Sequence, residues 1–108
     1  MDKAELQRKI EGGRFADANG EVLRTINILA GKDIRLSSLK SVLEDLNAGE
    51  LAESLYYLQD SGYIHARQIY SKEDADVADA DYSDTEVRLT ARGMQLLKGY
   101  ASDPAVRV

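Results

Sequence analysis

The sequence predicts a single α+β domain that is mostly helical, and three observations support this fold class. Residues 47–62 carry the pattern of a capped amphipathic helix. Residues 63–70 and 85–89 are rich in strand-forming types and are separated by a polar segment. The chain has 108 residues and a hydrophobic content of 44%, which suits one domain with one modest core.

The first elements are expected to be two short helices joined by a loop. Residues 2–11 have helical composition, with Leu6 and Ile10 one turn apart, and the following pair of glycines is expected to end that helix. An Asn-Gly turn signal closes the next stretch, so residues 14–20 are expected to form a loop. A second helix is expected over residues 20–30, with one apolar stripe at Val22, Ile26 and Leu29.

The next pattern predicts a third helix, after a short connector that can include a brief strand pairing. Ser37 or Ser38 can cap its first turn. Its apolar residues recur at the spacing of an amphipathic helix: Leu39, Val42, Leu43 and Leu46. If Asn47 caps the following helix, Leu46 lies in the turn between the two, which is a helix-turn-helix arrangement.

The helix over residues 48–61 has the clearest boundaries in the chain. Asn47 can cap its first turn, Glu50 can return a bond to the cap, and Gly62 suits the end because it adopts positive φ without strain. The neighbouring rings of Tyr56 and Tyr57 point about 100° apart on a helix, so we expect one in the core and one at the surface. Three leucines on one face are expected to be buried against the preceding helices: Leu51, Leu55 and Leu58.

After this helix the periodicity predicts a hairpin and a final helix. The connection between the two strands is acidic: residues 71–84 hold six acids and one lysine, a balance of −5, which equals the net charge of the whole chain. We expect residues 72–84 to be mobile, since they carry much like charge and lack apolar anchors. Thr90 is expected to cap the last helix, and Pro104 prevents that helix from continuing into the tail.

These elements, taken with specific residues, resemble a winged helix-turn-helix domain. The family's apolar pattern falls on Leu51, Leu55, Leu58, Gly62, Tyr63 and Ile64, and residues 89–97 are similar to the LTxxGxxLL exit of MarR-like proteins. The resemblance covers about residues 20–100 and implies a winged-helix domain there, with an N-terminal helix and loop at 1–19 before it and a tail at 101–108 after it. The size of the chain and its tail residues 103–106 also resemble small uncharacterised proteins of Mu-like phages and prophages.

In DNA-binding relatives of this fold, the second helix of the motif enters the major groove. The face that would do so here consists of Ala48, Gly49, Glu50, Ala52, Glu53 and Tyr57. It has no Arg, Lys, Asn or Gln, and its two carboxylates repel phosphates. Scattered phosphate contacts could come from Lys40, Arg67, Arg88 and Arg92. We therefore expect docking on a protein, or self-association, in preference to DNA, and the alternative is a DNA-binding transcriptional regulator.

Other functional classes find little support in the sequence. No nucleophile motif, phosphate-binding loop or metal-ligand spacing is present, so we expect a non-enzymatic protein with no cofactor and no metal. The acidic segment lacks the Gly and Glu that a calcium-binding EF-hand loop requires. No apolar run approaches the length that spans a bilayer, and we expect a cytoplasmic protein with no membrane partner.

Overall fold

The computed structural model describes residues 2–29 and 33–108. In chain order its elements are α1 (Lys3–Leu29), β1 (Ile34–Arg35), α2 (Leu36–Val42), α3 (Ala48–Asp60), β2 (Ile64–Gln68), β3 (Thr85–Leu89) and α4 (Ala91–Leu97). Within the described ranges this is an α+β fold, about half helical, with four helices and one three-stranded antiparallel sheet. At that level the expected fold class is confirmed.

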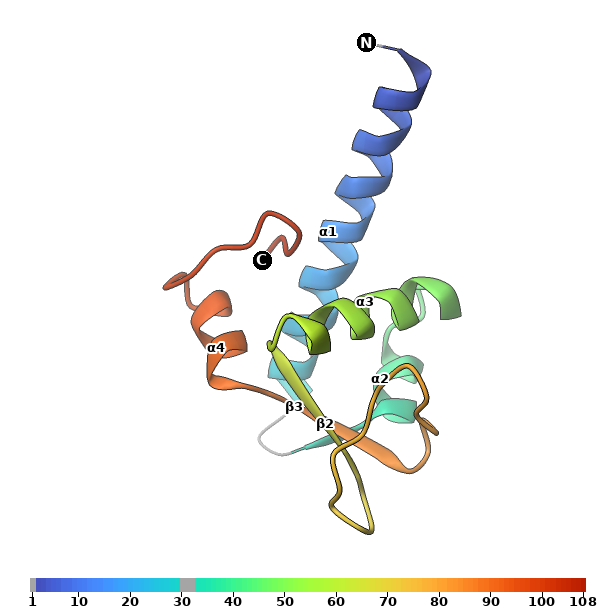
Figure 1. The fold of residues 1–108 in the computed structure, drawn as a ribbon, viewed down its shortest axis with the longest axis vertical. Coiled ribbons are helices and arrows are strands. Elements are labelled where there is room, and N and C mark those ends of the chain that lie inside the picture. Colours follow the sequence, from blue (N-terminus) through green and yellow to red (C-terminus); the bar gives the residue numbers. More distant parts are fainter. Residues whose placement is uncertain (1, 30–32) are drawn as a thin grey trace.

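The structure corrects the prediction for the N-terminal region. Instead of two helices and a loop, residues 3–29 form one helix, α1, whose N-terminal half projects beyond the rest of the fold (Figure 1). The expected boundary at residue 19 therefore lies inside a helix. The expected end of the second helix at residues 30–31 lies outside the described residues.

Tertiary contacts explain why the turn signal at Asn19 and Gly20 does not break α1. The buried Asn19 side chain donates a hydrogen bond to the carbonyl oxygen of Ala105 at 2.9 Å. A Cβ at Gly20 would lie 1.9 Å from the carbonyl oxygen of Arg107, so only glycine allows the C-terminal segment to approach here. Both residues are thus used for packing, and packing overrides their local turn preference.

The core lies between the sheet and the helices α1, α2 and α3. Leu51, Leu55 and Leu58 are buried there as expected, in one cluster with Ile26 and the α2 leucines. Leu29 and Val42 belong to the apolar stripes that the sequence predicts for the core. Both lie at helix ends and are not buried, because Leu29 is 44% exposed and Val42 is 55% exposed. The apolar period of the sequence is therefore followed closely in the middle of the helices and less well where they end.

The helix boundaries around α3 agree well with the sequence. The Asn47 side chain accepts a hydrogen bond from the Glu50 amide at 2.8 Å, and the Asn47 amide donates to the Glu50 carboxylate at 3.2 Å, which forms a capping box. Gly62 has φ +80° just past the end of α3, and Leu46 lies in the turn before it. The start of α2 differs from the prediction, because Arg35 precedes its first residue and makes no side-chain cap.

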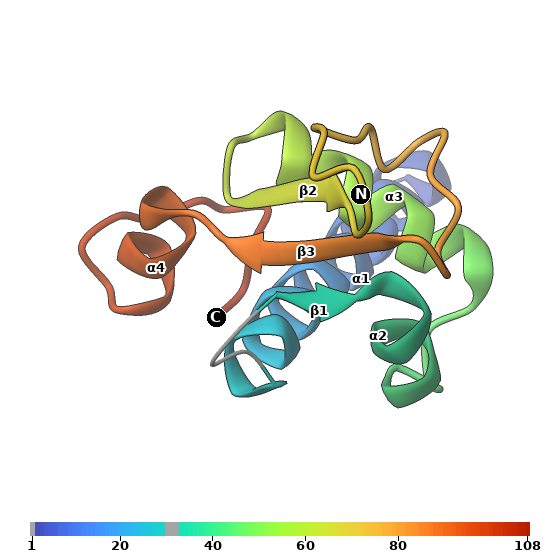
Figure 2. The same cartoon turned by 90° about the horizontal axis from the view of Figure 1, so that it is seen from below.

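The sheet has the strand order β1-β3-β2, with β3 in the centre (Figure 2). The expected hairpin is formed by β2 and β3, in which Ile64 is paired with Leu89 and Ala66 with Val87. The brief strand pairing in the connector also occurs, because β1 pairs with β3 through Ile34 and Val87. Alternate residues of the hairpin are buried, so one face of the sheet covers the core and the other is open to solvent.

The acidic segment, residues 71–84, is better anchored than the sequence suggests. Val77 is only 4% exposed, and Ala75, Ala80 and Tyr82 pack against the core. The Gln59 side chain of α3 donates to the carbonyl oxygen of Ala75 and accepts from the Val77 amide. The expectation that this segment lacks apolar anchors is therefore wrong.

The C-terminal residues 101–108 return to the side of α1 (Figure 1). Val106 is 4% exposed within the core cluster, and the Arg107 amide donates to the carbonyl oxygen of Ala16 at 3.0 Å. As expected, Thr90 caps α4, since its hydroxyl accepts from the Gly93 amide. The segment that we expected to be a tail thus forms part of the packed domain.

A carboxylate pair beside α1 gives a first testable prediction. Partial burial and the neighbouring Asp45 carboxyl raise the pKa of Glu21, while Arg24 opposes the shift. The charged Glu21 is therefore destabilising at neutral pH, and Glu21→Gln should raise the free energy of unfolding by about 0.2–1 kcal/mol. This increase in the free energy of unfolding should become smaller as the pH falls through the raised pKa of Glu21, because the carboxyl of the wild-type protein then takes up a proton.

Chemical denaturation of Glu21→Gln at neutral and mildly acidic pH measures this effect. Glu44→Gln, an exposed change in the same turn as Asp45, serves as the control and should alter stability little. A Glu21→Gln variant that is less stable than the wild type at neutral pH would contradict the prediction.

Candidate functional site

The outward face of α3 contains the residues that sequence analysis singles out for recognition. Ala48, Gly49, Ala52 and Glu53 are exposed there, and Glu50 is partly buried beside them. The side chain of Arg14 on α1 reaches this face and pairs with the Glu50 carboxylate at 3.1 Å. Arg14 is thus already paired with Glu50, and Glu53 makes no ion pair with any described residue.

Tyr57 is not part of this exposed face, contrary to the prediction. Its hydroxyl donates to Oδ2 of Asp103 at 2.7 Å, and its ring meets Phe15 edge-on with centroids 5.2 Å apart. The neighbouring Tyr56 is 56% exposed, so one ring of the pair packs inward and the other faces solvent, as expected. Tyr57 is therefore partly buried, and its hydroxyl holds the C-terminal segment.

Asp103 is the centre of that attachment. It also accepts from the Tyr63 hydroxyl at 2.8 Å and from the Ala105 amide at 2.9 Å. Burial works against its charge, but these hydrogen bonds outweigh burial and hold the pKa of the Asp103 carboxyl below its usual range. The Asp103 hydrogen bond and burial in turn raise the pKa of Tyr57.

The four cations proposed for phosphate contact have different surroundings. Arg67 on β2 is engaged, since its guanidinium contacts Asp33 at 2.6 Å and Glu86 at 2.7 Å. The Arg92 guanidinium lies 5.4 Å from the centroid of the Tyr63 ring. Lys40 and Arg88 are exposed and make no ion pair with another described residue. Arg67 and Arg88 share the open face of the hairpin, on the paired strands β2 and β3, whereas Lys40 lies on α2 and Arg92 on α4.

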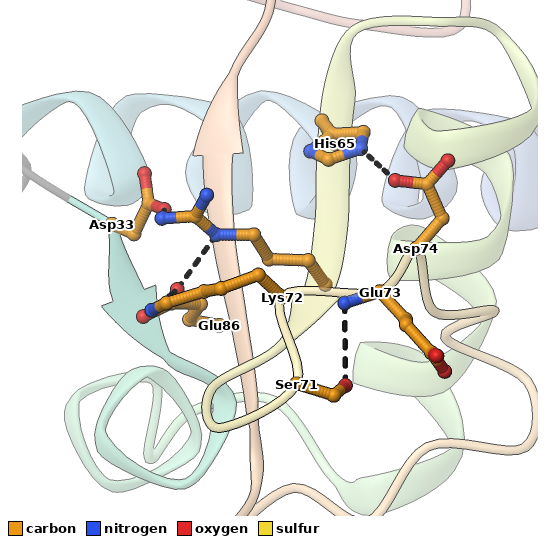
Figure 3. A network of polar contacts seen from close by, with 8 residues as sticks. Asp33, His65, Ser71, Lys72, Glu73, Asp74 and Glu86 are labelled. Carbon is orange, nitrogen blue, oxygen red and sulfur yellow. Dashed lines mark hydrogen bonds and ion pairs between the residues drawn. The ribbon is translucent and has the colours of Figure 1, made fainter.

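The open face of the hairpin carries a network of polar contacts (Figure 3). Lys72 joins Arg67 at the Glu86 carboxylate, with an N–O distance of 3.0 Å, and His65 contacts Asp74 at 2.8 Å. Burial would raise the pKa of Glu86, but the hydrogen bonds and charges of Lys72 and Arg67 lower it overall. On this face Arg67 and Lys72 are thus paired with local carboxylates, whereas Arg88 is exposed and makes no ion pair with another described residue.

A groove runs between α1 and α3 beside the exposed face of α3. Its volume is about 360 Å³, and its lining includes Glu11, Arg14, Phe15, Glu50, Glu53 and Ser54. We call it the α1–α3 groove. Sequence analysis found Glu50 and Glu53 but missed the α1 wall, because that wall depends on a helix that was expected to end at residue 11.

Two classes of site find no candidate in the described part of the chain. Residues 2–29 and 33–108 contain no group of three or more His, Cys, Asp or Glu side chains placed to hold a metal ion. None of the described helices combines the length and apolar character needed to cross a membrane.

Comparison with protein-family models, with curated proteins and with solved structures gave no significant match. The function has to be inferred from the chain's own residues.

Proposed function

We propose that this chain is a non-enzymatic binding module of the winged-helix type that docks on another protein through the exposed face of α3. The order of α2, turn, α3, hairpin and α4 supports the winged-helix assignment. The origin in a phage or prophage and the cytoplasmic location are proposals that rest on the sequence alone.

The charge on the exposed face of α3 is the single observation that carries this proposal. Glu50 and Glu53 stand where DNA-binding relatives place cations, and Arg14 offsets only one of them. Affinity for duplex DNA depends mainly on neutralising phosphates, so an acidic face opposes it. The same acidic face is well suited to a partner that offers positive charge.

The second candidate function is a DNA-binding regulator, and Lys40 and Arg88 are the observation in its favour. Both are exposed and unengaged among the described residues. Each phosphate that a cation neutralises contributes about 0.9 to the salt slope of duplex binding. Two such contacts give a shallow slope and weak affinity, which is why protein docking is preferred.

The test is to purify the tagged chain with its partner from its native cells, with and without nuclease. We expect one protein to be retained after nuclease treatment. Glu53→Lys should abolish that retention, because it reverses the charge at the exposed face of α3. Asp79→Lys, the same change on the acidic segment, is the matched control and should leave it intact. Loss of the partner on nuclease treatment would favour the regulator.

A further inference from the structure

We propose that the α1–α3 groove receives a guanidinium side chain from a basic segment of the partner protein. This inference rests on the proposed function and adds the chemical class of the group that is recognised. It follows from the charge of the groove, from a buried hydroxyl without a partner and from an aromatic wall.

The charge of the groove favours a cation. Three carboxylates line it, from Glu11, Glu50 and Glu53, against one cation, Arg14. Glu11 and Glu53 make no ion pair with any described residue. The groove therefore keeps two negative charges that a partner can neutralise.

Ser54 provides a second, independent observation. It lines the groove and is fully buried, yet its hydroxyl has no hydrogen-bond partner among the described residues. A buried polar group without a partner is costly, so an N–H donor that an occupant of the groove brings to this hydroxyl would be favourable.

The groove fits a guanidinium better than an ammonium. A guanidinium offers five N–H donors in a plane, which can serve a carboxylate and a hydroxyl at once, and its face stacks on aromatic rings. Phe15 supplies a ring in the wall of the groove. Arg14 already places a guanidinium against Glu50 within the chain, at 3.1 Å.

Arg14 then acts as an internal competitor of the partner's arginine. Its side chain is 71% exposed, and exposed ion pairs of this kind are weak, so an incoming guanidinium can displace it. Removing Arg14 should strengthen binding of the partner group, whereas a merely structural pair would leave such binding unchanged.

The experiment is an NMR titration of the isotopically labelled full chain with a short peptide whose only charged side chain is one central arginine. Matched peptides carry lysine or the uncharged isostere citrulline at the same place. We expect saturable shifts of the Ser54 and Glu53 amides, strongest with arginine and absent with citrulline. Glu53→Gln should weaken binding about two- to fivefold, and Arg14→Ala should strengthen it by a similar factor. Asp79→Asn, on the acidic segment, is the control and should change nothing.

Equal shifts with arginine and citrulline would overturn the proposal, and so would shifts confined to the acidic segment. Absence of saturable shifts at about 10 mM peptide would also overturn it. Concentration-dependent shifts of the groove amides without peptide would assign the occupant to a second copy of this chain instead. Failure here is distinct from failure of the proposed function, because a partner that is lost on Glu53→Lys, together with equal shifts from the arginine and citrulline peptides, keeps docking through the face of α3 and excludes only the guanidinium.

Discussion

Leu55→Ala is expected to lower the free energy of unfolding by about 2–5 kcal/mol. Leu55 is fully buried in the cluster that joins α3 to α1, α2 and the sheet. Truncation removes the transfer energy of the lost methyl groups and leaves a cavity that the surrounding helices can fill only in part. Urea denaturation followed by circular dichroism measures the change.

Val42→Ala is the matched control for this prediction. Val42 ends α2 and is 55% exposed, so its truncation should change the stability by no more than about 0.5 kcal/mol. A Leu55→Ala loss as small as that of Val42→Ala would show that α3 does not present this face to the core.

Removal of residues 103–108 is expected to have a comparable effect, a loss of about 2–5 kcal/mol in the free energy of unfolding. The truncation takes Val106 out of the core and leaves the Tyr57 and Tyr63 hydroxyls without Asp103. Asn19 also loses its acceptor at Ala105. Thermal or urea unfolding of the chain ending at residue 102 measures the loss.

The pH dependence gives this prediction a second, independent readout. The lowered pKa of Asp103 means that its contribution is present above the ordinary carboxyl pKa, about 4, and is lost as the pH falls below it. The stability difference between the full and the shortened chain should therefore narrow in acid. Identical unfolding midpoints of the two chains at neutral pH would show that the C-terminal segment contributes nothing.

The sequence predicts the central part of the fold well because its signals there are local. The capping box of Asn47 and Glu50, the positive φ of Gly62 and the Thr90 cap each depend on neighbours within a few residues. The leucine face of α3 is likewise set by helical spacing alone. These features need no knowledge of distant parts of the chain.

The errors occur where distant segments meet. Gly20 is a turn signal by itself, and only the approach of Arg107, far along the chain, shows why it lies within a helix. The acidic segment has no local signal for packing, because the side chain that anchors it, Gln59, lies on α3. Local propensity is weak compared with such tertiary contacts, so sequence patterns could not reveal them.

In the candidate site too, the features set by local helix register were predicted from the sequence, and those set by distant contacts were not. Glu50 and Glu53 follow from the register of the helix, and their exposure or partial exposure agrees with the sequence. The Arg14 pair and the unpartnered Ser54 depend on how α1 crosses α3, for which the sequence contains no local signal. Tyr57 was misplaced because its partner, Asp103, lies in the segment that was expected to be a tail.

A fluorescence-anisotropy titration of duplex DNA at about physiological salt tests the central claim most directly. We expect weak binding, no tighter than the general non-specific range of about 10⁻⁴–10⁻⁶ M, with random and genomic duplexes alike. Changing both Glu50 and Glu53 to Gln keeps a capping-box residue at the first of these positions and removes two repulsive charges, so it should raise this non-specific affinity. Nanomolar binding to one sequence, abolished by that double change, would contradict protein docking and establish the DNA-binding regulator.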